Sequence, residues 1–109
     1  MVKDVKQIIE EPITKAASYG SAQTDTAVWT PEKDKRIVLL GFMFSTAIAG
    51  SIRIKANNAD VIPPVHLAGN GYAHVNSTAP IWRGTLNQPL TVTSTISGSH
   101  SILLWGYEE

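Results

Sequence analysis

Apolar residues along the chain come in short runs, many with the period of two that is typical of β-strands. The most apolar run, residues 36–46, reads RIVLLGFMFST and carries apolar side chains at both odd and even positions. Because successive side chains of a strand point to opposite faces, such a strand has to be covered on both faces. We therefore expect residues 36–46 to form a central strand between a second sheet and either a loop, another sheet or another copy of the chain.

The last apolar run, residues 100–107, is also apolar on both faces and is expected to lie near the central strand. At least one face of this pair is expected to be covered by another subunit or by the N-terminal segment. Residues 51–55 and 90–96 instead alternate apolar and polar side chains, so each predicts a strand with one buried face. Residues 51–55 follow the central strand closely, and the two are expected to form a hairpin.

Turn formers separate these runs from further short strand candidates at residues 26–30, 65–67 and 72–75. Pro63 and Pro64 are expected to interrupt the sheet, since proline cannot lie in the middle of one. About eight closely spaced strands with almost no helix predict an all-β fold, a β-sandwich or barrel formed by residues 26–109. Residues 1–25 are interpreted as an N-terminal arm, in which residues 1–11 fit a short helix that Pro12 ends.

The charged residues are distributed unevenly. Residues 1–36 hold most of them, whereas residues 61–107 contain a single one, Arg83. The centres of interfaces between chains are depleted in Lys, Glu and Asp, so this charge-poor stretch predicts a stable oligomer. The alternative is a monomer whose neutral surface is kept in solution by its many Ser and Thr side chains.

The bulk composition excludes several classes of protein. The formal net charge is zero, so no basic field is present to attract nucleic acid. The chain contains no cysteine and therefore no disulfide framework or thiolate metal site. The apolar stretch at residues 37–49 is shorter than the roughly 20 residues that a membrane span needs. The N-terminus lacks the apolar segment of a signal peptide, and we expect neither secretion nor a membrane partner.

His66, His74 and His100 are the candidate metal ligands. His66 and His74 flank a Gly-Asn-Gly turn, which suits two residues that face each other across a hairpin. In a trimer, one histidine per chain on the axis would give a three-ligand site. A zinc site needs three or four converging ligands, so we favour ordinary strand histidines and expect no metal or other cofactor.

The carboxylates do not form a catalytic set. Asp60 is the only one between Asp34 and Glu108, and glycoside hydrolysis needs two that face a cleft. Neither Asp25, Asp34 nor Asp60 belongs to a recognisable motif of a Ser–His–Asp nucleophile. We expect that the chain is not an enzyme.

The aromatic side chains support two interpretations. They can form a platform on which sugar rings stack, or they can pack the core and anchor a subunit interface. In so small a domain packing is favoured, and glycan binding remains the alternative. The residues concerned are Trp29, Tyr72, Trp82, Trp105 and Tyr107.

Several segments resemble the small β-sandwich structural proteins of tailed bacteriophages, which decorate or cement capsids or belong to tails and fibres. The segments are Trp29-Thr30-Pro31, the strand that begins Lys35-Arg36, the turn Leu67-Ala68-Gly69-Asn70-Gly71 and the ending Leu104-Trp105-Gly106-Tyr107-Glu108-Glu109. The resemblance covers roughly residues 26–109. It implies a jelly-roll-like domain, a trimer, and an extended arm that grips neighbouring subunits in the virion.

The expected function is therefore that of a structural virion protein, assembled in the host cytoplasm, that decorates or cements a capsid as a homotrimer. Its partners would be its own copies and the major capsid protein or another virion protein. The alternative is a carbohydrate-binding module that recognises a receptor from a phage tail or fibre. The candidate interface residues are Val5, Ile9, Phe42, Phe44, Trp82 and Trp105.

Overall fold

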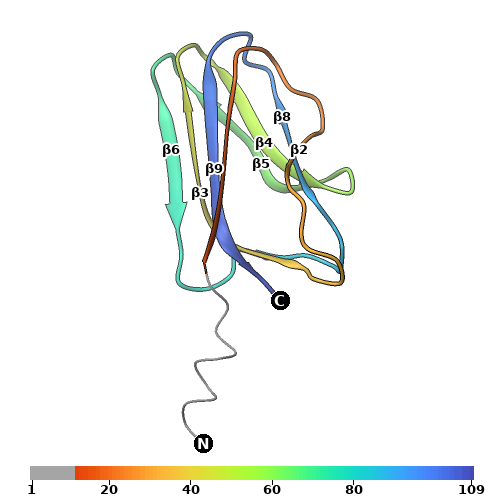
Figure 1. Cartoon of the computed structure of the whole chain (residues 1–109). Coiled ribbons are helices and arrows are strands. Elements are labelled where there is room, and N and C mark those ends of the chain that lie inside the picture. The colour runs from red at the N-terminus through yellow and green to blue at the C-terminus, as the bar shows by residue number, and fades with distance from the viewer. Residues whose placement is uncertain (1–11) are drawn as a thin grey trace, which may run out of the picture.

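Two antiparallel sheets packed face to face make up the computed structural model, which describes residues 12–109 (Figure 1). The front sheet has the strand order β1-β9-β3-β6, with the short strand β7 also paired to β3, and the back sheet has the order β2-β8-β4-β5. The strands are β1 (Ile13–Tyr19), β2 (Thr26–Trp29), β3 (Ile37–Thr46), β4 (Gly50–Ala56), β5 (Ala59–Leu67), β6 (Tyr72–Asn76), β7 (Trp82–Arg83), β8 (Leu90–Ser94) and β9 (His100–Glu108).

This order of strands is that of a jelly roll. Apart from β7, the strands form two sheets of four in which β1, β9, β3 and β6 face β2, β8, β4 and β5. The predicted all-β sandwich and its jelly-roll character are thus confirmed. The expected neighbourhood of the two most apolar strands is confirmed as well, because β3 pairs with β9 along its whole length.

The predicted hairpin between the central strand and residues 51–55 is wrong. β3 belongs to the front sheet and β4 to the back sheet, so the connection between them crosses from one layer to the other. Alternation along a strand tells which of its faces is buried, but it does not tell which strand lies beside it. The neighbour of β4 on one side is β5 and on the other side β8.

The boundary expected at residue 25 does not match the structure. Residues 13–19 form β1, an edge strand of the front sheet paired to β9 from Ile13 to Tyr19, and therefore belong to the sandwich. The short helix expected at residues 1–11 lies outside the described residues.

Pro63 and Pro64 lie within β5, where a strand break was expected. β5 is an edge strand, and the pairing register shifts so that both prolines lie opposite the single residue Arg53. A bulge on an edge strand is a place where the missing N–H of proline leaves no ladder hydrogen bond unmade.

The core lies between the two sheets and explains why the central strand is so apolar. The register of β3 against β9 shifts between Leu39 and Gly41. Before the shift Ile37 and Leu39 point into the core, and after it Phe42 and Phe44 do. The bulge therefore reverses which positions of β3 face inward. As a result, apolar side chains at odd positions before it and at even positions after it all point into the one core between the two sheets.

Within residues 12–109 the structure contains no helix long and apolar enough to cross a membrane.

Candidate functional site

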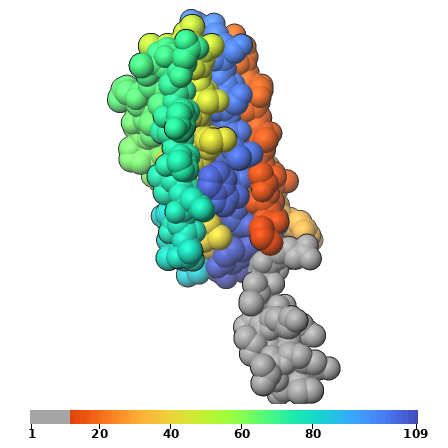
Figure 2. Space-filling view, turned by 90° about the vertical axis from the view of Figure 1, so that its left-hand side faces the viewer, coloured from red at the N-terminus to blue at the C-terminus, as the bar shows by residue number. Residues whose placement is uncertain are grey.

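The outer surface of the front sheet carries no charged side chain over β1, β9 and β6 and the part of β3 beside β6, and its exposed Arg83 lies on β7 at the end of the sheet, paired with Glu109. Figure 2 shows this surface, with β6, β3, β9 and β1 side by side. Cross-strand neighbours align its side chains in three rows, which we call the front face. The rows are Thr14, Trp105, Gly41 and Asn76; Ala16, Leu103, Met43 and His74; and Ser18, Ser101, Ser45 and Tyr72.

The middle row holds the apolar centre of the front face. Leu103 on β9 pairs with Met43 on β3. Both side chains point away from the core, because the residues on either side of each one along its strand point into it. Met43 is 39% exposed, and Leu103 is half-buried. On β1, Leu103 is flanked by Ala16, whose side chain is small. A partner can therefore approach this part of the face closely.

Trp105 lies flat across the neighbouring strand. A Cβ atom at Gly41 would overlap the Trp105 indole, so the glycine provides the space over which the ring lies. The indole Nε1–H donates to Oδ1 of Asn76 on β6, at 3.2 Å. Three strands are thereby joined on the outer surface, and the indole gives the face a broad, nearly flat apolar area.

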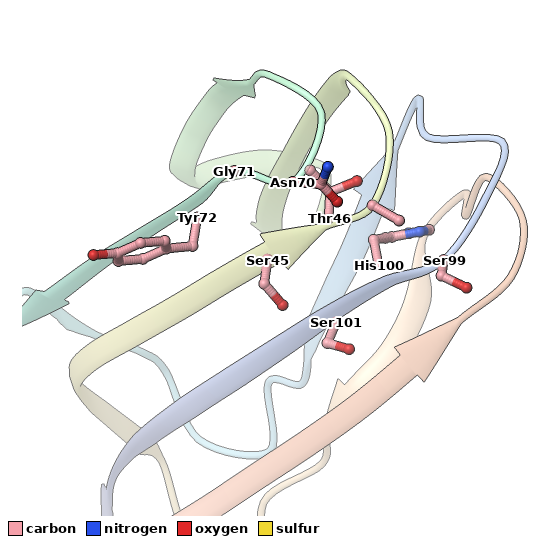
Figure 3. Close-up of a pocket in the computed structure, with 9 residues that line it drawn as sticks. Ser45, Thr46, Asn70, Gly71, Tyr72, Ser99, His100 and Ser101 are labelled. Atoms are coloured by element: carbon pink, nitrogen blue, oxygen red, sulfur yellow. The ribbon is translucent and has the colours of Figure 1, made fainter.

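A polar hollow of about 410 Å³ lies at the end of the front face, where the third row meets the loops (Figure 3). Ser45 and Ser101 form its floor, Asn70 lies on one side, and the Tyr72 side chain, which is 69% exposed, lies at its rim. A smaller hollow of about 190 Å³ adjoins it and runs over Ala16 and Met43. The surface therefore offers hydroxyl and amide groups without a formal charge.

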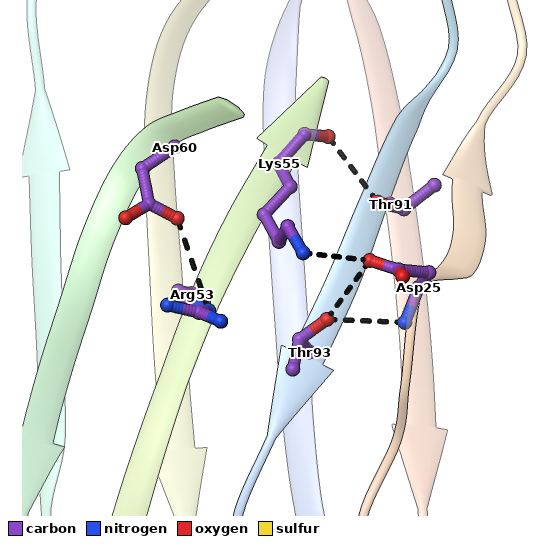
Figure 4. Close-up of polar contacts among 6 residues, drawn as sticks. All are labelled: Asp25, Arg53, Lys55, Asp60, Thr91 and Thr93. Atoms are coloured by element: carbon purple, nitrogen blue, oxygen red, sulfur yellow. Dashed lines mark hydrogen bonds and ion pairs between the residues drawn. The ribbon is translucent and has the colours of Figure 1, made fainter. Parts of the chain in front are cut away.

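The outer surface of the back sheet has the opposite character, and we call it the back face (Figure 4). The Lys55 ammonium lies 3.1 Å from the Asp25 carboxylate, and Nε of Arg53 lies 3.8 Å from Asp60. The Asp25 carboxylate also accepts a hydrogen bond from the Thr93 hydroxyl. Charged and hydroxyl side chains of this kind are typical of a surface that stays in water.

The Lys55 ammonium, which bonds to the Asp25 carboxylate, holds the pKa of that group below its ordinary value. A lowered folded-state pKa stabilises the fold above the unfolded-state pKa, and this stabilisation is lost as the pH falls through the folded-state pKa. We expect Asp25→Asn to lower stability at neutral pH, and this effect to shrink as the pH falls through the lowered pKa of Asp25. Urea unfolding at several pH values checks this, and in a Lys55→Met background the pH dependence of the Asp25→Asn effect should largely disappear.

A buried polar pair, Ser94 and His100, lies inside the sandwich. The Ser94 hydroxyl is 2.8 Å from His100 Nε2, and His100 Nδ1 is 2.8 Å from the Gly98 carbonyl oxygen. A carbonyl can only accept, so Nδ1–H donates to it, and in the neutral ring Nε2 accepts from Ser94. The backbone N–H of Gln23 also donates to the Ser94 oxygen.

This pair has the composition of a nucleophile and a base, but its position indicates a structural role. Ser94 and His100 are only 5% and 2% exposed, and the partner of Nδ1 is a carbonyl oxygen rather than a carboxylate. Ser94 falls on the inward register of its strand, beside Val92. A polar residue at an inward position was the signal in the sequence that points to this pair.

We expect Ser94→Ala to lower the free energy of unfolding by about 2 kcal/mol, since it leaves the buried His100 Nε2 and the partly buried Gln23 N–H without these hydrogen bonds. Ser18→Ala is the matched control, because the Ser18 hydroxyl bonds to Ser101 on the exposed front face. Its effect should stay within about 0.5 kcal/mol. Chemical denaturation followed by circular dichroism measures both, and equal effects would contradict the structural role.

The two histidines expected to face each other across a hairpin lie in different sheets. His66 is on β5 in the back sheet, where it pairs with Ser51, and His74 is on β6 in the front sheet, where it pairs with Met43. The Gly69-Asn70-Gly71 turn thus joins the layers instead of closing a hairpin. Among residues 12–109 no three His, Asp or Glu side chains are grouped so that they can hold a metal ion.

The candidate interface residues fall into three groups. Phe42 and Phe44 are 7% and 0% exposed in the core of a single chain, so they offer no surface to a partner, contrary to the interface role expected of them. Trp105 lies on the front face, and Trp82 is half-buried against the core beside β3. Val5 and Ile9 lie outside the described residues.

The five aromatic residues do not form one platform. Trp29 is fully buried, and its indole N–H donates to the carboxylate of Glu108 at 2.8 Å. Trp105 and Tyr72 both belong to the front face, but they lie in its two outer rows, with the row of Met43 between them. Tyr72 is the most exposed large hydrophobic side chain of the described chain, and it stacks near His74 with ring centroids 6.4 Å apart.

No protein-family model and no curated protein matches the chain. The capsular polysaccharide assembling protein CapF from Staphylococcus aureus is a structural match with 12% identity and a TM-score of 0.42, covering 88% of this chain and 24% of CapF. The chain thus spans about a quarter of the length of CapF. The Tobacco streak virus coat protein matches with 13% identity and a TM-score of 0.43, covering 90% of this chain and 85% of the coat protein. Likenesses this weak carry no argument about function.

Proposed function

We propose that the chain is a structural virion protein that decorates or cements a capsid and binds its neighbours through the front face. The observation that carries this proposal is the contrast between the two outer surfaces of the sandwich. The front face has no charged side chain and a centre of Leu103 and Met43, whereas the back face holds the ion pairs of Lys55 and Arg53. Depletion of charge at the centre of a surface is typical of protein interfaces.

The resemblance to small structural proteins of tailed bacteriophages is our reason for proposing that the partner of this surface is a virion. A decoration protein has to adhere to a lattice of identical subunits, and several contacts of modest strength act together on such a lattice. A flat sheet face suits this task because it needs no cleft. The charged N-terminal segment, residues 1–11, would add a second contact through Val5 and Ile9.

A particle-binding experiment tests the proposal. Particles purified on a density gradient from the source of the gene are stripped of the chain and then mixed with the wild type, with Leu103→Glu or with a chain that lacks residues 1–11. The deletion stops before β1, so it leaves every described strand in place.

We expect the wild type to sediment with the particles and Leu103→Glu to lose most of this binding, and the shortened chain to bind more weakly. Leu86→Glu serves as the control, because Leu86 is 51% exposed in the loop between β7 and β8, outside the front face. A chain that is absent from purified particles and does not bind them would refute the proposal.

A receptor-binding carbohydrate module is the second candidate, and the polar hollow beside Tyr72 is the observation that favours it. Hydroxyl and amide groups without formal charge match a neutral sugar, and an exposed tyrosine ring provides a stacking surface. A glycan array with the wild type and Tyr72→Ala tests this. Signals that disappear in Tyr72→Ala would support the module, and an array without signals would remove it.

A further inference from the structure

We infer that the free edge of β6 accepts an extended segment of another polypeptide as an additional strand of the front sheet. β6 is the outermost strand of this sheet on the side opposite β1 (Figure 1). The occupant is a short run of residues in strand conformation, with a large apolar side chain beside Val75 and neutral side chains on its other face. The site consists of the main-chain groups along the edge, whereas the proposed function concerns the front face, so the inference goes beyond that function and does not depend on it.

The ladder between β3 and β6 determines which main-chain groups of β6 are free. At one end of this ladder the Thr46 N–H donates to the Gly71 carbonyl, and at the other end the Ser77 N–H donates to the Leu40 carbonyl. Each of these bonds lies just outside the terminal residue pair of the ladder. In antiparallel strands this arrangement means that the two residues of a terminal pair do not bond to each other.

Bonded and non-bonded pairs alternate along an antiparallel ladder. Ala73 and Val75 therefore bond to β3, and the N–H and C=O groups of Tyr72, His74 and Asn76 point away from it. None of the hydrogen bonds found among residues 12–109 uses these outward main-chain groups. An added strand can pair with all three residues, and such main-chain bonds supply the affinity when a peptide extends a sheet.

The other three edges of the sandwich each carry a feature that opposes strand addition. On β1, Lys15 shares the inward register of Ile13 and Ala17, where a charge hinders a further strand. β2 has only four residues and an irregular register, and β5 contains the bulge at Pro63 and Pro64. β6 pairs with β3 over five residues without a register shift, and it contains neither proline nor a charged side chain.

Val75 indicates what the added strand has to cover. It pairs with Phe42 and therefore lies on the core side of the front sheet. Phe42 is buried, but the Val75 side chain is 41% exposed, so the core is incompletely covered at this edge. A large apolar side chain on the added strand would remove this area from water, which favours binding.

A second copy of β6 suits this edge less well than a different segment. An antiparallel pairing that uses the whole length of both strands is centred on His74 and sets Val75 beside Ala73 of the other copy. The alanine side chain is too small to cover the valine. Because β6 carries no charge, no ion pair selects the partner, and the selectivity comes from the apolar residue beside Val75.

A proline substitution tests the edge directly. Heptapeptides displayed on a library are selected on the immobilised chain, and a selected peptide is synthesised with a fluorophore as the probe. His74→Pro removes an N–H that β3 does not use, so the fold keeps its ladder, whereas the added strand loses a bond and meets the proline ring. By fluorescence anisotropy we expect the dissociation constant to rise at least ~10-fold for His74→Pro and less than ~2-fold for the matched control His74→Thr, which keeps the N–H.

Hydrogen exchange of the wild type, measured by NMR, locates the bound peptide without any substitution. We expect the amides of Tyr72, His74 and Asn76 to exchange at least ~10-fold more slowly in the complex, and those of Ala73 and Val75 to be protected with and without the peptide. Urea unfolding checks that both variants are folded.

A library that yields no binder, a peptide that binds His74→Pro as tightly as the wild type, or a complex without new protection along β6 would overturn the inference. A wild-type dimer that His74→Pro dissociates would also overturn it, because a second copy would then occupy the edge. No particle takes part in these measurements, so each of these outcomes leaves the proposed function standing.

Discussion

Replacing Trp29 with alanine should lower the free energy of unfolding by about 4 kcal/mol, which is among the largest effects that a single substitution produces in a domain of this size. The Trp29 side chain is fully buried between the sheets. Its indole N–H is also one of two donors to the Glu108 carboxylate, the other being the backbone N–H of Glu32 at 3.0 Å. The substitution therefore opens a cavity and removes a partner from a buried carboxylate at the same time.

Trp105→Ala is the matched control, since Trp105 is the same residue type on the outer surface. It should cost about 1 kcal/mol, because only part of its apolar area is buried in one chain. Trp29→Phe keeps most of the volume but not the N–H donor, and an intermediate loss of about 2 kcal/mol is expected. Urea unfolding followed by circular dichroism, at concentrations that keep the chain monomeric, gives all three values. Equal losses for Trp29→Ala and Trp105→Ala would contradict the described orientation of these strands.

Gly106→Ala should destabilise the fold by about 3 kcal/mol, more than the same substitution at Gly41. A Cβ atom at Gly106 would overlap the backbone carbonyl of Val38 on the neighbouring strand, at the place where the register of β3 shifts. Backbone held in a ladder on both sides cannot move aside without breaking hydrogen bonds. The alanine therefore forces β3 and β9 apart.

Gly41→Ala meets a side chain instead of backbone, because its Cβ atom would overlap the Trp105 indole. The indole can turn away into solvent, so we expect a loss of only about 1 kcal/mol. This rotation of the Trp105 side chain would break the hydrogen bond from its indole N–H to Asn76, and the tryptophan emission should shift to longer wavelength. An emission spectrum without any shift would show that Trp105 does not lie over Gly41.

The strands and the fold class could be predicted from the sequence because both depend on local alternation. Residues 90–96 alternate cleanly, and β8 lies there in the structure. The layer to which each strand belongs could not be predicted, since alternation carries no information about neighbours. For this reason β4 was expected beside β3, although it lies in the other sheet.

The two-sided apolar character of residues 36–46 had a cause that no simple period reveals. A bulge between Leu39 and Gly41 reverses the inward positions, so Phe42 and Phe44 lie in the core and not at an interface. A glycine near the middle of a strongly apolar strand was the available signal. The part of β3 that remains on the outer surface contributes Met43 and Ser45 to the front face.

Buried polar residues were also recognisable in principle. Ser94, His100 and Glu108 all occupy positions that share the inward register of the apolar residues around them. Their partners come from distant segments, such as Trp29 for Glu108, and a single sequence does not specify such pairs. The assignment of the front face depends on the same tertiary information, because four strands from both ends of the chain contribute to it.

Sedimentation of Leu103→Glu with stripped particles, compared with that of Leu86→Glu, tests the docking role of the front face most directly. We expect Leu86→Glu to sediment with the particles like the wild type and Leu103→Glu to stay mostly in the supernatant, because Leu103 lies at the centre of the front face and Leu86 lies outside it. Equal binding of the two variants would contradict docking through the front face.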